Sequence, residues 1–526
     1  MHDIIIVGAG SAGCILAEKL SRDPACKVLL LEAGGQDGHV FLRMPAGVAK
    51  AIGSDRFNWK FKTVPQLHME NRQLDVPRGR VLGGSSAINA LAYVRGHPED
   101  YNTWETMGCP GWGWADVLPV FKEVEGNQRG ADDYHGGDGP LTVSDPESGN
   151  PAFKAFIEAG RTMGFPITTD FNGAQPEGFG YYQLNIRDGR RWSAADAFLH
   201  PAMTRPNLEV KTGAQALGLM LDKTRVIGVK TAEGTLEADH VILATGAIGT
   251  PHLLMLSGIG PAKNLYKHGL SVIIDRPGVG ANLHDHLEAK VKFRMTEPLS
   301  LWSHAKFPNN LLTGAQWLLT GQGVGRQQGL EAGAFLRLLS GAGPPDTQLH
   351  FINALSFDGG TAADRGHGFA IDTTQLQPRS RGTLTLASAD PSAAPLIDPN
   401  YLAEDADRIA MREGLRMLRD LCHQEPLAKL CGEELRPGPA VTTAAGLDAV
   451  VRKTADSIYH PVGTAKMGPE SDPMAVVDPS SMKVHGLEGL FIADASVMPR
   501  ITSGNTHAPS VMIGTKAADL IASALG

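Results

Sequence analysis

The stretch that decides the fold is Asp3-Ile4-Ile5-Ile6-Val7-Gly8-Ala9-Gly10-Ser11-Ala12-Gly13, at the start of the chain. An apolar run leads into a glycine-rich turn, and residues 14–21 have the composition of a helix. A second apolar run, residues 27–31, ends on Glu32. In such a unit the glycines let the backbone approach a pyrophosphate, the helix N-terminus stabilises its charge, and the carboxylate accepts ribose hydroxyls. The stretch therefore predicts a dinucleotide-binding unit.

This unit does not by itself choose between NAD and FAD. A glycine-rich turn without a ligand is the simpler alternative, but it would not require an acid 19 residues after Gly13. The place of the unit at the start of the chain, followed by Ala33-Gly34-Gly35, favours FAD over NAD.

Composition limits the classes of protein to consider. With 526 residues and 42% hydrophobic residues, the chain exceeds what one core usually supports, so two domains are expected. A net charge of -8 without a long basic run gives no electrostatic indication of binding to nucleic acid or to an anionic membrane. We find no apolar run of about 18 residues and no secretory leader, so we expect a cytoplasmic protein without a transmembrane segment. Peripheral membrane contact stays open.

The five cysteines are scattered and form no CxxC pair. This pattern indicates free thiols in a reducing compartment and predicts no metal site.

The rest of the chain predicts an α/β fold in which a Rossmann-like domain is interleaved with an α+β domain. Residues 76–90 are rich in glycine and serine, which suits close approach to a flat ligand, and residues 240–256 form a second strand-turn-helix unit. Segments between 296 and 455 alternate between strand-like and helical patterns. We therefore assign residues 1–150, 201–295 and 456–526 to the cofactor-binding domain, and residues 151–200 and 296–455 to the substrate-binding domain.

Two histidines near the C-terminus are candidates for catalysis. His460 lies in Ile458–Thr464 and His507 in Gly504–Pro509, and both segments are bounded by glycine and proline. A strand-like run ending on Asp494 lies between them. A lone histidine is more often structural, but two in irregular backbone near a returning nucleotide fold favour an active site.

The sequence resembles the glucose-methanol-choline (GMC) oxidoreductase family over essentially its whole length. The resemblance rests on the N-terminal unit, Gly79–Asn89, Gly246–Gly260 and the histidine pair, in this order. Within the family the chain is most similar to choline-dehydrogenase-like bacterial alcohol dehydrogenases, through Tyr93–Tyr101 and Gly278–His286.

The resemblance implies an FAD-dependent enzyme that oxidises a primary alcohol to an aldehyde, with hydride transfer to flavin N5. It assigns His460 as the general base, a role that suits an imidazole with an ordinary pKa of about 6.5. His507 falls where the family has histidine or asparagine, and choline-dehydrogenase-like members generally have asparagine. His507 could share the base role, donate a hydrogen bond to the substrate oxygen or stabilise an alkoxide.

The resemblance also implies a set of cofactor-binding residues. Glu32 would bind the adenosine ribose, Trp59 either covers the cofactor or belongs to the core, and Ala216 could offer backbone to the adenine. Relatives that attach FAD covalently use a histidine where this chain has Ile88, so we expect non-covalent FAD. The remaining candidates are Gly8, Gly10, Ser11, Ala12 and Gly13 at the pyrophosphate, Ala33 after Glu32, Arg80, Gly84, Asn89 and Ala92 on the flavin side, and Asp494 with the backbone near His507.

Other functions stay open from the sequence. A flavin-containing hydroxynitrile lyase, a non-catalytic flavin-binding protein and a nicotinamide-dependent dehydrogenase are the alternatives. With 6% aromatic residues there is no obvious aromatic cage for a quaternary ammonium group, which favours an uncharged primary alcohol over choline. The electron acceptor is a quinone or O2, with a tilt toward the quinone, and the sequence does not indicate an oligomeric state.

Overall fold

The computed structural model describes residues 2–339, 343–355 and 365–525, and two large sheets form within these residues. The first sheet has the order β10-β2-β1-β13-β12-β11, with β24 also paired to β13. Strands β10, β2, β1, β13 and β24 run parallel, and β1 is apolar because it lies between β2 and β13. The bounds are β1 (His2–Val7), β2 (Val28–Glu32), β10 (Leu208–Thr212), β11 (Ala216–Asp222), β12 (Arg225–Thr231), β13 (Gly234–Leu243) and β24 (Leu490–Ile492).

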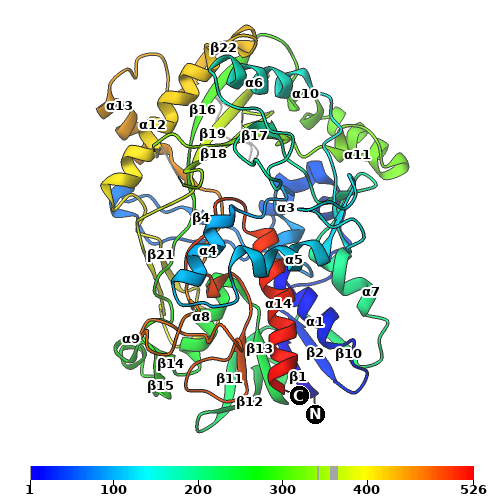
Figure 1. Cartoon of the computed structure of the whole chain (residues 1–526), viewed down its shortest axis with the longest axis vertical. Coiled ribbons are helices and arrows are strands. Elements are labelled where there is room, and N and C mark those ends of the chain that lie inside the picture. Colours follow the sequence, from blue (N-terminus) through cyan, green and yellow to red (C-terminus); the bar gives the residue numbers. More distant parts are fainter. Residues whose placement is uncertain (1, 340–342, 356–364, 526) are drawn as a thin grey trace.

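Helices from both ends of the chain cover this sheet. α1 (Ser11–Leu20) and α14 (His507–Leu525) pack side by side, as Figure 1 shows in blue and red. A Cβ atom on Gly514 of α14 would lie 2.8 Å from Ala12 Cα, so glycine permits this close approach. α8 (Gly246–Leu256) follows β13. The predicted Rossmann-like unit is therefore confirmed.

The second sheet is antiparallel, with the order β22-β16-β19-β18-β17-β7. Helices α6 (Pro151–Thr162) and α12 (Asp405–Cys422) supply apolar residues to the same core as Leu349 and Phe351. Because side chains alternate along a strand, Gln348 and His350 point to the opposite face. The bounds are β7 (Gly178–Tyr181), β16 (Leu287–Met295), β17 (Ala332–Leu336), β18 (Thr347–Ile352), β19 (Gly368–Gln375) and β22 (Cys431–Arg436).

The structure corrects some of the expected domain bounds. We placed residues 201–295 with the cofactor domain, but β16 pairs with β19 in the second sheet. Its alternation of apolar and charged residues was a signal that we missed. In the other direction, Leu384, Leu386 and Ile397 pack in the core of the first sheet although they lie within 296–455. The division into two domains otherwise stays a prediction.

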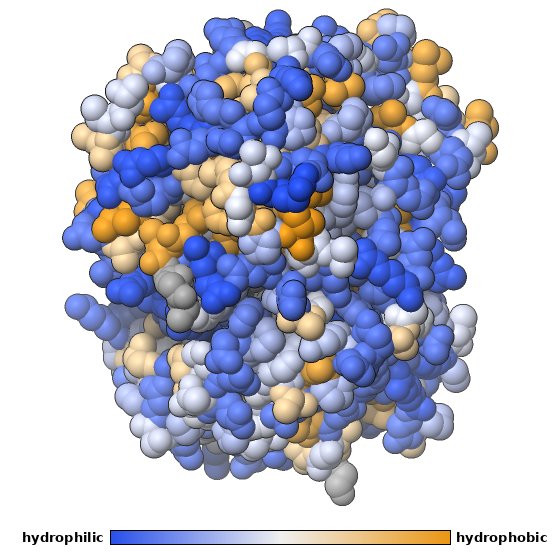
Figure 2. All heavy atoms as spheres, turned by 45° about the horizontal axis from the view of Figure 1, so that its top comes forward, coloured by the Kyte–Doolittle hydropathy of each residue, from blue (hydrophilic) through white to orange (hydrophobic). Residues whose placement is uncertain are grey.

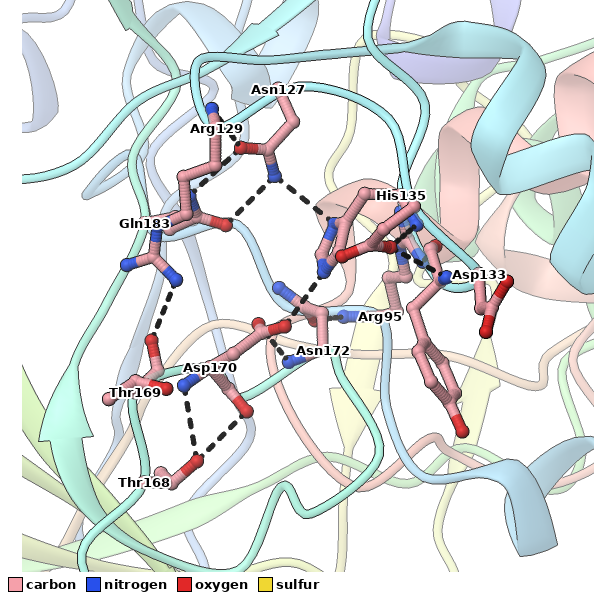
Figure 3. A network of polar contacts seen from close by, with 12 residues as sticks. Arg95, Asn127, Arg129, Asp133, His135, Thr168, Thr169, Asp170, Asn172 and Gln183 are labelled. Atoms are coloured by element: carbon pink, nitrogen blue, oxygen red, sulfur yellow. Dashed lines mark hydrogen bonds and ion pairs between the residues drawn. The ribbon is translucent and has the colours of Figure 1, made fainter.

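A buried polar network connects several loops between residues 95 and 183 (Figure 3). Glu125, fully buried, forms ion pairs with Arg95 and with His135 Nδ1, the latter at 3.0 Å. His135 Nε2 also contacts Asp170 Oδ2 at 2.8 Å, and Asn127 donates to Glu125 at 2.9 Å. The network thereby joins residues 95–135 to the segment that precedes the second sheet.

No helix in the parts of the chain that the structure describes is both long and apolar enough to cross a membrane. The face in Figure 2 is largely hydrophilic, with hydrophobic residues gathered in separate patches.

Candidate active site

The glycine-rich turn after β1 has the geometry that a pyrophosphate requires. Gly8 has φ of 101°, and a Cβ there would meet Ala244 O at 2.6 Å. A Cβ on Gly13 would lie 1.8 Å from Gly8 O, so α1 packs directly against the turn. Gly10, by contrast, has open space around its Cβ direction, and no side chain caps α1. The N-terminal amides of α1 are thus left available to an anion.

Glu32 at the end of β2 is held in place by the backbone. Its carboxylate accepts hydrogen bonds from Ala9 N at 3.0 Å and from Gly34 N at 2.7 Å. Burial raises the pKa of Glu32 to about 7, against these two hydrogen bonds and nearby Arg80. Ribose hydroxyls would add donors to this carboxylate and favour its charged form. Ala33 follows Glu32 and is half-buried.

The second glycine segment lies directly on the first. Gly84 has φ of 54°, and a Cβ there would lie 2.7 Å from Gly10 Cα. This turn continues into a short helix at Gly84–Ala87, which is followed by Ile88. Ile88 is buried and packs in a small apolar cluster, so no imidazole is available at this position.

Three other residues that we predicted to bind the cofactor are Arg80, Trp59 and Asn89. The Arg80 guanidinium lies 4.8 Å from the ring centre of Trp59, and Arg80 Nε is buried without a hydrogen-bond partner. Asn89 Oδ1 accepts from Arg191 Nη1 at 2.7 Å and from Leu91 N at 3.1 Å. Arg80, Trp59 and Asn89 are all half-buried, as expected for residues that a ligand would cover.

Three predicted residues have clear structural contacts of their own. Asp494 Oδ2 accepts from Gly246 N at 2.8 Å and from Thr250 Oγ1 at 2.6 Å, which ties the start of α8 to the C-terminal segment. Ala92 is buried and forms a bridge with Leu184. Ala216 begins β11, where it pairs with Thr231 of β12, and the described residues show no hydrogen bond between it and the glycine turns.

His507 belongs to the cofactor side of the site. It is the first residue of α14, and its Nδ1 lies 2.9 Å from Ser11 Oγ at the start of α1. Burial, with a smaller effect of Arg191, lowers the pKa of His507 to about 4, so it is neutral at physiological pH. Within the described structure His507 forms no hydrogen bond to His460.

The partner of His460 is Asn505, which sequence reasoning missed. Asn505 Nδ2 lies 3.4 Å from His460 Nε2, at the long limit of a hydrogen bond. Gln348 Nε2 donates to Asn505 Oδ1 at 3.0 Å, which turns the Asn505 amide nitrogen toward His460. His460 and His507 therefore form no hydrogen bond with each other among the described residues, and the catalytic role of His507 stays a prediction. The glycine-bounded segment Asn505-Thr506-His507 pointed to the histidine, and only the structure shows the contact of Asn505 with His460.

His286 sets the tautomer of His460. Burial lowers the pKa of His286 to about 3, so its ring is neutral. His286 Nε2 donates to Leu376 O at 3.2 Å, which leaves Nδ1 as an acceptor. His460 Nδ1 lies 3.0 Å from that atom and must carry the proton. His460 Nε2 therefore holds a free lone pair on the side of Asn505.

A single carboxylate fixes the backbone around both histidines. Asp285 Oδ1 accepts from His460 N at 2.7 Å and from His286 N at 2.9 Å. Asp285 Oδ2 accepts from Ser457 Oγ at 2.5 Å and from Tyr401 OH at 2.6 Å. Burial raises the pKa of Asp285, against these hydrogen bonds. Tyr459 precedes His460 with φ of 70°, a strained conformation that such a network can hold.

The second sheet forms a polar wall beside this pair. His350 Nδ1 lies 2.8 Å from Asp372 Oδ1, and the His350 ring stacks on Tyr182. Gln348 also donates to Tyr182 OH at 3.0 Å, while its Oε1 is buried without a hydrogen-bond partner. This oxygen is a candidate acceptor for a substrate hydroxyl or amine.

One group of metal-ligating side chains occurs among the described residues, at Asp37, Asp196 and His200. Arg43 already forms ion pairs with both carboxylates. The cluster therefore has its own cation and lies outside the site described above.

Taken together, the nucleotide turns, Glu32 and the buried His460–Asn505 pair define the class as a flavin-dependent oxidoreductase. Comparison with family models is decisive: the GMC oxidoreductase N-terminal model matches residues 2–288 and the C-terminal model matches residues 378–514. The chain belongs to the GMC oxidoreductase family, and its cofactor is FAD.

Known relatives extend over nearly the whole chain. An oxygen-dependent choline dehydrogenase of Rhizobium rhizogenes is 44% identical over 99% of this chain and 95% of its own length. The mitochondrial choline dehydrogenase of Mus musculus is 43% identical over 99% of this chain and 89% of its own length. Among solved structures, pyridoxine 4-oxidase of Mesorbium loti has a TM-score of 0.89 and 34% identity, covering 99% of each chain. A variant of Aspergillus oryzae formate oxidase studied for its FAD modification has a TM-score of 0.92 and 27% identity, covering 99% of this chain and 98% of its own.

Proposed function

We propose that the protein oxidises an uncharged primary alcohol to an aldehyde, with His460 as the base that removes the hydroxyl proton. The observation that carries this proposal is the proton arrangement at His460. Its Nδ1–H is committed to His286, so Nε2 carries the lone pair that can accept a proton. Bound FAD would supply the acceptor for the hydride that leaves the substrate carbon.

Asn505 gives the substrate oxygen a second partner. Its Nδ2 is directed toward His460 Nε2 by the hydrogen bond from Gln348. A hydroxyl placed between them would donate to His460 and accept from Asn505. As the proton moves to His460, the amide would stabilise the developing negative charge on oxygen. The burial of His460 limits competing access of water.

The charges around His460 support an uncharged substrate. Burial lowers the pKa of His460 most, and His286, Arg78 and His350 lower it further. The carboxylates on this side, Asp285 and Asp372, are already engaged by hydrogen bonds and by His350, so a cationic substrate would meet the Arg78 guanidinium without an unengaged carboxylate among these residues. Choline is the second candidate, because the curated relatives at 44% identity are choline dehydrogenases.

The acceptor of the electrons is a quinone-like compound or O2. The oxygen-dependent relatives and the oxidases among the structural neighbours support O2. The resemblance to choline-dehydrogenase-like enzymes supports a quinone as the alternative acceptor. We further propose a cytoplasmic location.

Anaerobic absorbance spectra test this function. The purified holoenzyme is mixed with uncharged primary alcohols, with choline and with a hydroxynitrile. We expect the visible flavin band to disappear with an uncharged alcohol and an aldehyde to form. Bleaching by choline alone would contradict the substrate class, and cleavage of the hydroxynitrile without bleaching would indicate a lyase. Rapid recovery of the band in air would assign O2 as acceptor, and slow recovery a quinone-like compound.

A further inference from the structure

Large hydrophobic side chains are exposed in one short part of the described surface far more densely than elsewhere. We call this part the 302–321 segment. Scattered exposed leucines are normal in soluble proteins, whereas a cluster marks an interaction site. The exposed fractions are 79% for Phe307, 61% for Leu311, 66% for Leu312, 60% for Leu318 and 86% for Leu319.

The segment consists of two helices, α10 (Trp302–Ala305) and α11 (Asn309–Thr320). Leu311, Leu312, Leu318 and Leu319 are spaced so that they share one face of α11. At about 100° per residue, Trp317 lies on the opposite face. It is the one residue of α11 that is buried.

Trp317 anchors the helix to the body of the protein. Its indole nitrogen donates to Gly189 O at 2.7 Å, and its side chain fills the space beside Gly325. The leucine face therefore points away from the protein, the reverse of an ordinary surface helix. In Figure 1, α11 projects at the right edge of the molecule, and Figure 2 shows hydrophobic residues at its upper right.

The charge of the segment differs from that of the whole chain. No aspartate or glutamate occurs between Glu297 and Glu331, although the net charge of the protein is -8. The exposed Lys306 ammonium lies 4.4 Å from the ring centre of Trp302. An apolar helix face flanked by a lysine and an aromatic ring, without carboxylates, is complementary to an anionic lipid surface.

We propose that the 302–321 segment docks the protein on the surface of a lipid bilayer. The leucines of α11 and Phe307 enter the boundary between headgroups and acyl chains, and Lys306 contacts lipid phosphates. A second copy of the chain fits the observations less well, because the apolar residues stand on a projecting helix and not on a broad flat face. The charge complementarity also has no counterpart in a contact between two identical, acid-free segments.

Vesicle flotation with the full-length holoenzyme tests the proposal. The probes are vesicles of phosphatidylcholine alone and of phosphatidylcholine mixed with phosphatidylglycerol. We expect binding to the mixed vesicles, and a loss of about tenfold or more when Leu311, Leu312, Leu318 and Leu319 are all replaced by glutamine. Lys306→Gln should weaken binding to the mixed vesicles and leave binding to phosphatidylcholine unchanged.

Matched controls separate docking from folding and from self-association. Leu67→Gln with Tyr266→Gln removes two exposed side chains elsewhere, at 73% and 68% exposure, and should leave vesicle binding unchanged. The quadruple variant should keep the flavin content and thermal midpoint of the wild type. Wild-type protein that does not float would overturn the proposal. So would a wild-type dimer that the quadruple variant converts to a monomer with unchanged vesicle binding.

Discussion

At the scale of single residues, the protonation of His460 decides the chemistry. Burial lowers its pKa well below 6.5, and His286, Arg78 and His350 lower it further. A base is useful only in its unprotonated form, so these neighbours keep His460 ready to accept a proton at neutral pH.

The pH dependence of kcat/KM follows from this arrangement. Because the neutral imidazole is the active form and its pKa is lowered, activity should persist as the pH falls through 6.5 and be lost only at lower values. Steady-state rates across the acidic range, with the flavin content checked at each pH, measure this. An acidic limb with its midpoint at or above pH 6.5 would disagree with the buried, neutral His460.

The choice between Asn505 and His507 could not be made from the sequence. Only Thr506 separates the two residues, and the direction in which each side chain points depends on where α14 begins. Because α14 starts at His507, that ring lies against Ser11 of α1, while Asn505 stays in the turn that faces His460. A histidine in a sequence is readily predicted to be a base, whereas the role of an asparagine follows only from its contacts in the structure.

At the scale of elements, the contact between the two glycine turns controls cofactor binding. Gly84→Ala would place a Cβ 2.7 Å from Gly10 Cα in a backbone with φ of 54°. Strain of about 1–3 kcal/mol should weaken FAD retention by about tenfold or more. Flavin absorbance per protein after gel filtration measures this. Gly38→Ala is the matched control, since its Cβ would meet nothing within 4 Å, and full flavin content in both variants would contradict the assignment.

The polar network in Figure 3 should make stability depend on pH. Burial opposes the charge of His135, but hydrogen bonds to Asp170 and Glu125 outweigh it and raise the pKa of His135 to about 9. The folded-state pKa thus lies above the ordinary value of 6.5. The stabilisation is fully present below pH 6.5 and is lost as the pH rises through 9.

His135→Gln should therefore lower stability by about 1–3 kcal/mol at pH 6.5. The gap between variant and wild type should shrink toward pH 9. Thermal midpoints of the holoenzyme at both pH values measure this, with the exposed His423→Gln as control. A constant gap at both pH values would show that His135 acts by packing alone.

Some elements could be predicted because their sequence patterns report burial directly. β1, β2 and the end of β13 (residues 241–243) contain continuous apolar runs, as expected for parallel strands covered on both faces. The bounds of the second sheet could not be placed well, because strands such as β16 and β7 pair with partners far along the chain. Apolar residues such as those of α11 are usually buried, and only the structure shows that the leucines of this helix are exposed to solvent.

At the scale of the whole molecule, the site lies where the two sheets meet. The turn after β1 and the Gly84 turn packed on it form the cofactor side, and the C-terminal segment supplies His460 and Asn505. The second sheet contributes Gln348, which orients Asn505. The sequence predicted the cofactor half of this arrangement, whereas the His286–His460–Asn505–Gln348 chain arises from tertiary packing.

Release of the cofactor tests its mode of attachment in the whole protein. Ile88 is buried in an apolar cluster and has no nucleophilic atom. Denaturation should therefore release all of the FAD into the filtrate of an ultrafiltration cell. Flavin that stays with the denatured protein would mean that another side chain forms a covalent bond.

The most direct test of the central claim is the rate of anaerobic flavin reduction by a primary alcohol in three single variants. His460→Ala should reduce this rate by about 10²–10⁴-fold, as for loss of a general base. Asn505→Ala should also slow it, whereas His507→Ala should mainly reduce FAD retention, because His507 contacts Ser11. A rate that survives in His460→Ala but collapses in flavin-loaded His507→Ala would contradict the account.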